Sequence, residues 1–563
     1  MNRYVRLAIS LLATVLVGLG AFYFWLPALN IQSQEFWIFI LLLILTFGLF
    51  FGVLRKAETV VVVGSGKNQR VKKTFLRKGH RGIVFLDSIS FNKVYFIIVL
   101  IPIAVLVIGS LFSSIVFNAK GFSQVITVTE HEFEKDMPEV EYISNIALMD
   151  TDSAKKLGDR ELGALAKVVS QFRLSEEYTQ INYQGTPQKV AHLDYDGFFK
   201  WMSNSNEGIP GYVMVDAVKN SAKYVELDKK MKYSDGAYFG DDLYRAVRFA
   251  YPTKIIGNFS FEVDENGEVF YVISCLSPKV GLFGAYDVSE VILFDPVDGS
   301  HELLSLDAVP SWVDIVYDGY LACEKYDWQG IYAGGFLNSF ITKQGCKKTT
   351  ADFGYIMRDD DVWYFTGVTS VTADASNIGF ILSNARTGEY KFYPVVGAEE
   401  FSAMGSAEGE VQEKRYTASF PSLVNIMGEP TYIMVLKDDI GAIRLYALVN
   451  VEQYNIVATG VSQDEAKKLY KERLVQNGIV EVPATPEPTV ELKTETVTVE
   501  KIDLVSIDGN TVVYVKDTKG NLFKMNFTEE NEEILLVDPS DKLKITYVEG
   551  ATSNVIYSFK PIK

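Results

Sequence analysis

Few residues in this chain have types and spacings suited to catalysis or metal binding. The histidines are His80, His131, His192 and His301. His192 lies in the segment HLDYDG, which places Asp194 and Asp196 beside it. An imidazole next to carboxylates can act in acid–base chemistry or bind a metal, so His192 is the one histidine with such a candidate role.

The other histidines and the three cysteines carry weaker signals. His131 lies in TEHEFEKD without the second histidine of a zinc-protease helix, so a solvated helix face is the preferred interpretation. His301 follows a turn and is expected to pack or hydrogen-bond on a strand. The cysteines form no CxxC pair, which excludes a zinc knuckle. Cys323 and Cys346 could form a disulfide in an oxidising compartment, and the alternative is small buried thiols.

Carboxylate clusters and tryptophans complete the candidates. The clusters are Asp150 with Asp152, Asp241 with Asp242, and Asp359 to Asp361. None has the alternating oxygens and glycine of a calcium loop, so turns and helix caps explain them best. Carboxylates distant in sequence could still meet as a hydrolytic pair. For a ligand surface the candidates are Trp201, Trp312, Trp328 and Trp363, with core packing as the alternative. No catalytic residue, cofactor or metal ligand is assigned, and the chain is not expected to be an enzyme.

Three apolar runs predict transmembrane helices at about 5–28, 36–54 and 95–117. The connection between the first two has no Lys or Arg, whereas the loop 55–94 has ten. The positive-inside rule therefore predicts a cytoplasmic N-terminus, a cytoplasmic basic loop and an extracellular or periplasmic C-terminal region. The first run is expected to stay uncleaved.

The basic loop contains a glycine turn that superficially resembles a phosphate loop. Its sequence is VVVVGSGKNQRVKK, in which Val61 replaces the first glycine and Asn68 the magnesium-binding Ser or Thr. A short β-hairpin is therefore the better interpretation. The loop could also bind anionic lipid, or it could serve topology alone.

Beyond residue 117 the sequence repeats a helix followed by strands and two kinds of turn. The first turn type is Gly-x-x-x-Tyr, proposed at Gly208, Gly267 and Gly428. The second is an Asp or Asn that ends an apolar strand and can bond its own backbone. These residues are Asp216, Asp295, Asn384 and Asn450. Full copies are predicted at 240–306 and 397–460, a third around 333–395, and a partial copy near 159–227.

The segment 240–275, followed by VILFDPVDGSHELL, resembles the PepSY module of bacterial extracytoplasmic proteins. That module is a helix followed by an antiparallel sheet with two characteristic hairpins. Here the hairpins would be Asn266 to Val272 and Asp295 to Ser300, and Arg386 to Glu389 matches the second one best. The whole chain also resembles large multi-span membrane proteins of Firmicutes. The resemblance implies binding of peptides or proteins, and it carries over no site residue.

The C-terminal region is predicted to be a separate small domain. Ser462 and Glu465 have the spacing of a capping box and predict a helix over 462–477. VPATPEPT is a Pro-rich spacer, and the remainder alternates as strands of a small OB-like barrel. The predicted regions are the membrane region 1–117, an α+β region 118–239, a PepSY-like repeat region 240–460, a helix and linker 461–492, and an all-β domain 493–563.

The fold class is therefore α+β: three transmembrane helices, repeated helix-plus-antiparallel-sheet modules and a small β-barrel. The chain has a net charge of −17, of which the first 116 residues carry +9 and the remainder −26, so nucleic acid is not expected as a partner. The sequence predicts a bacterial envelope protein, anchored in the lipid bilayer, that binds a peptide, protein or wall component. A carboxylate hydrolase and an accessory subunit of a transport or secretion complex remain the alternatives.

Overall fold

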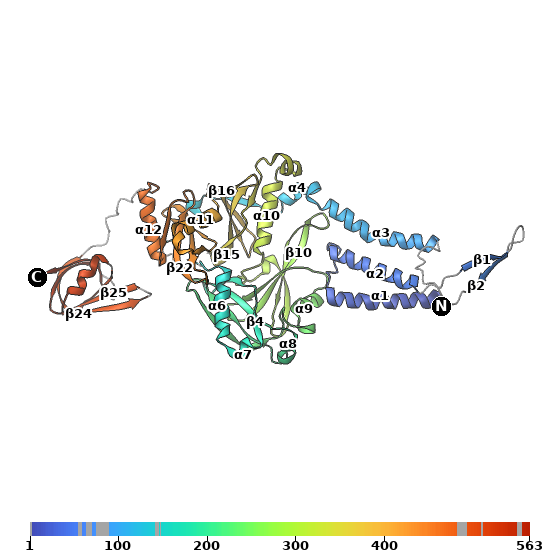
Figure 1. Ribbon diagram of the computed structural model, residues 1–563, viewed down its shortest axis with the longest axis horizontal. Coiled ribbons are helices and arrows are strands. Elements are labelled where there is room, and N and C mark those ends of the chain that lie inside the picture. Colours follow the sequence, from blue (N-terminus) through green and yellow to red (C-terminus); the bar gives the residue numbers. More distant parts are fainter. Residues whose placement is uncertain are drawn as a thin grey trace. The chain divides into compact units, whose positions relative to one another are not determined.

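The computed structural model describes residues 3–53, 59–63, 70–74, 89–140, 146, 148–480, 493–507, 510–527, 529–548 and 554–562. It divides into two compact units, a large one over 1–477 and a small one over 478–563. Figure 1 shows the elements of each unit in chain order.

Three apolar helices long enough to cross a membrane begin the large unit, at the three apolar runs of the sequence. They are α1 (Arg3–Trp25), α2 (Gln34–Val53) and α3 (Ile89–Phe112). Helix α2 packs against both others (Figure 1). At Gly48 an added Cβ would lie 2.0 Å from the Tyr95 hydroxyl, so glycine permits this close approach of α2 and α3.

The third span ends earlier than predicted. A break at Ser113 and Ser114 separates α3 from α4 (Ile115–Ser123). The Ser113 hydroxyl accepts hydrogen bonds from the backbone N–H groups of Leu282 (2.8 Å) and Phe283 (2.9 Å). The helix thus ends where it meets a distant hairpin, a contact that hydropathy does not encode.

Within the basic loop, residues 59–63 and 70–74 form the predicted hairpin, and residues 89–94 already belong to α3. Strands β1 (Thr59–Val63) and β2 (Arg70–Thr74) pair antiparallel. The remainder of the loop, including Gly64 to Lys67, lies outside the described residues. The orientation of the loop relative to a membrane stays a prediction.

Four modules follow, and each combines a helical part with a four-stranded antiparallel meander. The first strand of the meander is continuous in module 2 and is divided into two short strands in modules 1, 3 and 4. Module 1 contains α6 (Thr151–Gly163), α7 (Ala166–Val169), β4 (Phe172–Leu174), β5 (Thr179–Tyr183), β6 (Thr186–Tyr195), α8 (Phe198–Asn204), β7 (Ile209–Asp216) and β8 (Ser221–Met231). Module 2 contains the 3-10 turn η2 (Phe239–Asp241), α9 (Leu243–Ala250), β9 (Ile255–Val263), β10 (Val269–Val280), β11 (Gly284–Phe294) and β12 (His301–Ser305).

The other two modules repeat this order. Module 3 contains α10 (Gly319–Tyr332), β13 (Lys347–Thr349), β14 (Gly354–Arg358), β15 (Asp361–Ser370), β16 (Ala373–Asn384) and β17 (Tyr390–Tyr393), with β3 (Val128–Glu130) added parallel to β17. Module 4 contains α11 (Glu400–Glu410), β19 (Thr417–Ala418), β20 (Ser422–Ile426), β21 (Glu429–Lys437), β22 (Ile443–Asn450) and β23 (Val457–Gly460). Helix α12 (Gln463–Gln476) follows, and the helix of module 3 begins earlier than the predicted copy at about 333.

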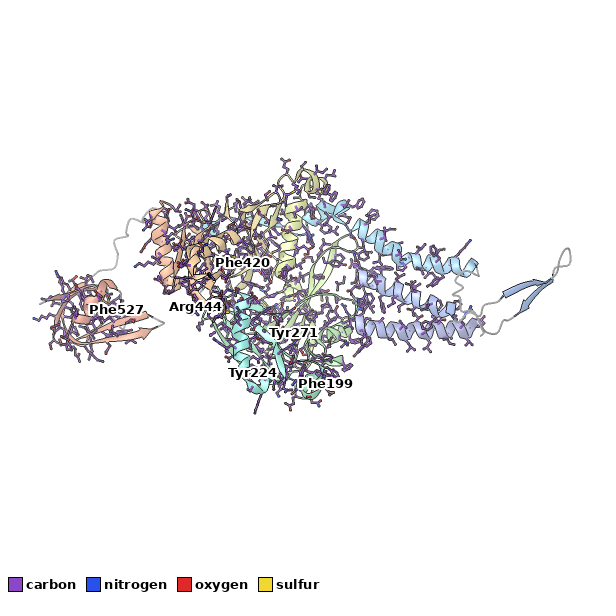
Figure 2. The ribbon with its side chains drawn as sticks, in the orientation of Figure 1. Phe199, Tyr224, Tyr271, Phe420, Arg444 and Phe527 are labelled. Atoms are coloured by element: carbon purple, nitrogen blue, oxygen red, sulfur yellow. The ribbon has the colours of Figure 1, made fainter. Side chains whose placement is uncertain are left out.

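The sheets pack in pairs. Modules 1 and 2 share one apolar core, in which Tyr212 meets Phe261 with ring centroids 5.7 Å apart. Modules 3 and 4 share a second core, in which Phe380 meets Tyr432 at 5.8 Å. An isolated meander has one apolar face to bury, and sheet-on-sheet packing buries it. Figure 2 labels Tyr271, another aromatic side chain of the first core.

The predicted Asp and Asn turns are confirmed in all four modules. Asp216 accepts backbone hydrogen bonds from residues 218 and 219, at 3.0 and 2.8 Å. Asp295 accepts one from residue 297 at 2.7 Å. Asn384 accepts from residues 386 and 387, and Asn450 from residue 453. Local side-chain chemistry alone specifies these turns, which explains why the sequence predicted them.

The first hairpin of module 1 differs from the predicted register. Strands β5 and β6 meet at Gln184 and Gly185, both with positive φ. Gly208 instead precedes β7, the third strand. Counting from the turn, Lys189 occupies the position held by tyrosine in the other modules. Lys189 is buried, and burial lowers its pKa to about 8, while its Nζ lies 4.6 Å from the centre of the Tyr355 ring.

The small unit is a closed five-stranded barrel, as predicted. Its strands are β24 (Lys493–Ile507), β25 (Asn510–Asp517), β26 (Leu522–Asn526), β27 (Lys542–Val548) and β28 (Asn554–Ile562), with the 3-10 segment η6 (Glu529–Leu536) between β26 and β27. The closed order is β24-β25-β26-β28-β27, with β26 and β28 parallel. Val513, Phe523 and Leu543 are fully buried in its core.

Candidate ligand-binding groove

The histidine singled out by the sequence lies inside the core shared by modules 1 and 2. His192 Nε2 is 3.6 Å from Asp194 Oδ1, an ion-pair distance longer than a hydrogen bond. Burial lowers the pKa of His192, but the carboxylates of Asp194, Asp235 and Glu177 together outweigh it and the net shift is upward. The rings of Phe261 and Tyr271 cover the imidazole at 5.3 and 5.4 Å, whereas Asp196 is exposed beyond the strand. A substrate would have to open the core to reach His192.

The predicted carboxylate clusters serve as caps and turns. Asp150 caps α6 by accepting from the Ser153 N–H at 2.9 Å, and Asp242 caps α9 in the same way at Arg245. Asp359 and Asp360 form the hairpin between β14 and β15 with positive φ. Within the part of the chain that the structure describes, no group of three or more His, Cys, Asp or Glu side chains is arranged to hold a metal.

The cysteines are free and the candidate tryptophans have different surroundings. Cys275 and Cys346 are buried thiols, and Cys323 is half-buried, so Cys323 and Cys346 form no disulfide here. Trp328 and Trp363 are buried in the core. Trp201 is half-buried against the core of modules 1 and 2, and Trp312 lines an open groove.

The groove lies on the outer face of the module 2 sheet, opposite the core shared with module 1. Alternation along β10 turns Tyr271 towards that core and Phe270 to the outer face. Leu293 and Glu302 are directly opposite each other on β11 and β12. The groove has a volume of about 430 Å³ and is lined by Asp264, Phe270, Leu293, Asp295, Ser300, His301, Glu302 and Trp312.

A covering segment, residues 309–317, closes the rest of the outer face. Its valines, among them Val313 and Val316, pack with Val272 of the sheet in an apolar cluster of their own. The Ser274 hydroxyl donates to the Val316 carbonyl at 2.5 Å. The groove is the part of this face that the covering segment leaves open.

Glu262 anchors the covering segment. Glu262 lies on β9, directly opposite Phe270 of β10, so both side chains point to the outer face of the sheet. Its carboxylate accepts hydrogen bonds from the backbone N–H groups of Asp314 (2.7 Å) and Ile315 (3.0 Å). This anchor places Trp312 against Phe270, with ring centroids 5.2 Å apart and planes tilted by 39°. The aromatic wall of the groove thus depends on a buried carboxylate fifty residues upstream.

The anchor is a pair of buried acids. Burial raises the pKa of Glu262 and also of Asp314, and the charge of Asp314 adds to the rise at Glu262. The Asp314 carboxylate accepts from the Asn182 N–H at 2.7 Å, which joins the covering segment to module 1. Sequence reasoning missed this pair. The signal was Glu262, the one charged residue of β9, between Phe261 and Val263.

The opposite side of the groove is acidic. Glu302 is exposed and has no hydrogen-bond or ion-pair partner among the described residues. Asp295 uses one oxygen for its turn, through the Val297 N–H, and within the described chain its other oxygen has no partner. Asp264 uses both of its oxygens within its own hairpin. Two acceptors are therefore available beside an aromatic wall.

The imidazole of His301, which also lines the groove, already has a partner within the protein. Its Nδ1 lies 2.9 Å from the Tyr251 hydroxyl, and the two rings are 5.0 Å apart. It is opposite Phe294, whose side chain belongs to the shared core. His301 therefore packs and hydrogen-bonds, as the sequence predicted.

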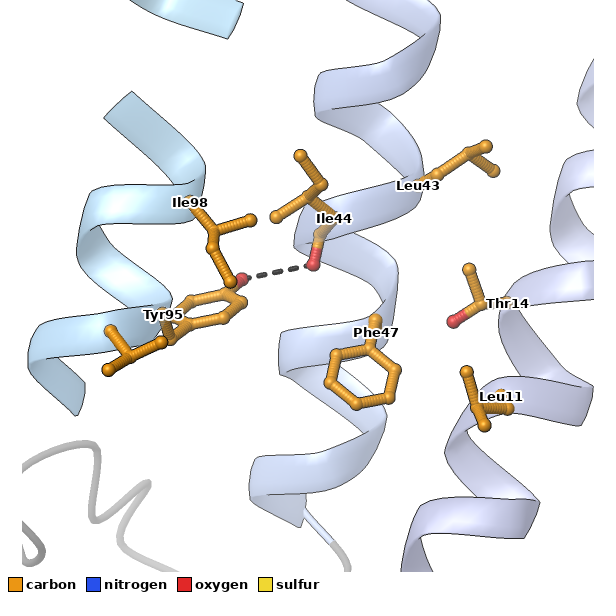
Figure 3. A pocket seen from close by; sticks show the side chains of 8 residues that line it. Leu11, Thr14, Leu43, Ile44, Phe47, Tyr95 and Ile98 are labelled. Atoms are coloured by element: carbon orange, nitrogen blue, oxygen red, sulfur yellow. Dashed lines mark hydrogen bonds between the residues drawn. The ribbon is translucent and has the colours of Figure 1, made fainter. Parts of the chain in front are cut away.

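A second hollow of about 270 Å³ lies among the three apolar helices (Figure 3). Its lining is Leu11, Thr14, Leu43, Ile44, Phe47, Val94, Tyr95 and Ile98. The Thr14 hydroxyl donates to the Ser10 carbonyl at 2.8 Å, and the Tyr95 hydroxyl donates to the Ile44 carbonyl at 3.1 Å. The lining carries no charge, so this hollow suits an acyl chain or an apolar helix and offers no ion site.

Module 4 holds another buried acid, Glu400, which is fully buried at the start of α11. Burial raises its pKa to about 7. One carboxylate oxygen accepts from the Gly367 N–H. Hydrogen bonds from the Gly367 N–H and from the side chains of Thr350 and Asn377 oppose this rise in pKa, and burial outweighs them.

Replacing Glu400 by Gln should flatten the pH dependence of stability. In the folded protein the pKa is raised above its unfolded value of 4.5, so the native state binds the extra proton and stability falls as pH rises from about 5 through about 7. Glu400 alone is expected to contribute about 3 kcal/mol to this loss. Urea unfolding of the full chain in detergent at pH 5 and pH 8 measures it.

The matched control is Glu413→Gln, at an exposed carboxyl three residues beyond α11. It should keep the wild-type slope. An equally steep pH dependence in Glu400→Gln would contradict the assignment of a proton to Glu400.

Comparisons with known proteins add little to this geometry. No family model matches the sequence, and no curated protein matches it. Among solved structures, an ancestral GH74 enzyme aligns over 64% of this chain and 42% of its own length, at 10% sequence identity and a TM-score of 0.15. The chain thus spans less than half of that protein, and a likeness this low carries no argument about fold or activity.

Proposed function

We propose that this protein is a membrane-anchored extracytoplasmic binding protein of the bacterial cell envelope, which holds a peptide, protein or wall component in the groove of module 2. The observation that carries the proposal is the groove itself. An aromatic wall, Phe270 and Trp312, faces a rim with two available acceptors on Asp295 and Glu302. Pockets with an apolar wall and a few placed polar groups are typical of ligand sites.

The chemistry of the groove favours a ligand that carries an amine or guanidinium group. Carboxylates attract a cation and accept its hydrogen bonds, and an aromatic face attracts the same cation. Lysine or arginine side chains of a peptide, or free amines of a wall peptide, supply this group. The three apolar helices and the basic loop support an arrangement with the modules outside the cytoplasm.

The PepSY resemblance and the barrel fit the same proposal. Four helix-and-meander modules agree with a repeated PepSY-like unit, whose known members bind peptides or proteins. The strand order of the small unit agrees with an OB-like barrel. An accessory role in a transport or secretion complex is the second candidate, because the apolar hollow of Figure 3 could receive a partner helix. Co-purification with another membrane protein that depends on Phe47 would support it.

Replacing Trp312 by Ala should weaken binding of lysine-containing peptides by about tenfold or more, because a central aromatic anchor is lost. Glu302→Gln should weaken the same peptides and leave acidic peptides unaffected. Asp295→Asn removes the charge and keeps the turn, since Asn384 and Asn450 form the equivalent turns. Fluorescence polarisation with the full chain in detergent measures each affinity.

The matched control is Tyr454→Ala, which removes an exposed aromatic ring from module 4. Its affinity should equal that of the wild type. Peptide binding that survives Trp312→Ala and Glu302→Gln together would reject the groove as the site. Cleavage of the bound peptide, lost in Glu302→Gln, would reject a pure binding role in favour of a hydrolase.

A further inference from the structure

An exposed aromatic patch lies on module 1 and the start of module 2. We define the patch as Phe198, Phe199, Met202, Tyr238 and Phe239. Phe199 is 74% exposed, and Met202 and Phe239 are each 55% exposed. Phe198 links the two sides, with its ring 5.2 Å from that of Tyr238 and 6.3 Å from that of Phe239. Soluble surfaces rarely present so many contiguous large apolar side chains, and such patches mark interaction sites.

One residue of the patch, Phe239, has a strained backbone conformation. Phe239 has φ +54°, a left-handed conformation that a bulky side chain rarely adopts. The Arg245 guanidinium donates to the Phe239 carbonyl at 2.7 Å and stabilises this turn. Strain of this kind persists only where surrounding contacts enforce it. The exposed position of Phe239 therefore costs folding free energy, which the surrounding contacts offset.

The same arginine joins the patch to the end of the first membrane helix. Arg245 Nε donates to the Tyr23 carbonyl at 3.4 Å, and its guanidinium lies 4.5 Å from the centre of the Tyr23 ring. One turn later on α9, Phe249 meets Phe22 with ring centroids 5.7 Å apart. Tyr23 belongs to the last turn of α1, where aromatic rings mark the boundary between hydrocarbon and headgroups.

Module 2 also contacts the ends of the other two membrane helices. The Tyr286 hydroxyl donates to the Gln32 carbonyl at 2.8 Å, just before α2. The Leu282 N–H reaches Ser113, just after α3. These contacts hold module 2 against the ends of all three apolar helices. Figure 2 shows Phe199 in the part of the large unit that lies towards α1.

We propose that the aromatic patch docks into the headgroup region of the bilayer beside α1. The inference rests on the anchoring of the chain by its three apolar helices. Aromatic rings and methionine bury their apolar surface at this depth. Lys200 lies on α8 together with Phe199 and Met202 and can contact anionic headgroups. A lipid surface is favoured over a protein partner because the patch continues the membrane end of α1 through Arg245. Docking would restrict the four modules to one tilt relative to the membrane plane.

The test is a nitroxide label at Phe199→Cys in the full chain, reconstituted in vesicles of phosphatidylcholine with phosphatidylglycerol. The matched control is Tyr454→Cys, an exposed aromatic site on module 4. The native Cys275 and Cys346 are buried, and the wild type labelled in parallel gives the background. If Phe199→Cys fails to fold, Met202→Cys carries the same measurement.

The label at position 199 should collide with molecular oxygen several-fold more often than the label at 454, and several-fold less often with a water-soluble nickel chelate. Equal access of the chelate to both positions would overturn the inference. Chelate access that stays high in vesicles and falls only after addition of envelope proteins would also overturn it, and would assign the patch to a protein partner.

Discussion

Replacing Glu262 by Ala is expected to lower the free energy of unfolding by about 3–5 kcal/mol, because two buried backbone donors lose their acceptor. The N–H groups of Asp314 and Ile315 both depend on this carboxylate. The covering segment should then detach and take Trp312 away from Phe270. Urea unfolding of the full chain in detergent measures the first effect, and chymotrypsin cleavage within the covering segment measures the second.

Two variants separate the anchor from a simple loss of charge. Glu262→Gln keeps one acceptor oxygen and should fall between wild type and Glu262→Ala. Glu265→Ala changes an exposed carboxylate in the adjacent turn and should stay within about 0.5 kcal/mol of the wild type. If Glu262→Ala retains wild-type stability and a protected covering segment, the anchor does not hold the groove together.

Replacing Lys325 by Met should destabilise the large unit by a similar amount, about 3–5 kcal/mol. Lys325 on α10 of module 3 is 2% exposed, and its Nζ lies 2.6 Å from Asp287 Oδ1 on β11 of module 2. Burial lowers the pKa of Lys325, and the carboxylate of Asp287 opposes that shift. The ammonium also lies 4.5 Å from the centre of the Tyr317 ring. Removing it leaves a buried, unpaired carboxylate between the two modules.

The double variant Lys325→Met with Asp287→Asn should recover most of that loss, since no unpaired charge remains and the amide oxygen can still accept from the Val288 N–H. Lys230→Met, in an exposed pair with Glu207, is the control and should cost less than about 1 kcal/mol. A double variant as unstable as Lys325→Met alone would show that the pair acts through packing and not through its charge.

Local features of this fold were predictable because their causes lie within a few residues. The spans follow from uncharged apolar runs, and the structure confirms three helices of sufficient length. The capping box at α12 is also confirmed: Ser462 accepts from the Glu465 N–H at 3.2 Å, and Glu465 reaches back to the Val461 N–H at 2.7 Å. The closed five-stranded barrel likewise agrees with the predicted alternation.

Register was harder to predict than element type. The pattern Gly-x-x-x-Tyr occurs at Gly208 as well as at the true hairpins, but Gly208 lies just before the third strand, β7. The hairpin of module 1 lies at Gly185, where Lys189 replaces the expected tyrosine. A short turn motif fixes a local conformation, while strand order depends on which sheet faces find a partner.

The amino-acid sequence by itself determined the membrane helices, the Asp and Asn turns, the helix caps and the repeating order of helix and strands. Hydropathy, turn chemistry and capping act over a few residues, so the sequence displays them directly. Only the tertiary structure decided that His192 is enclosed while Trp312 lines a groove. It also decided that Glu262 anchors a segment fifty residues away. Burial depends on which distant surfaces pack together, and no local pattern of residues records that choice.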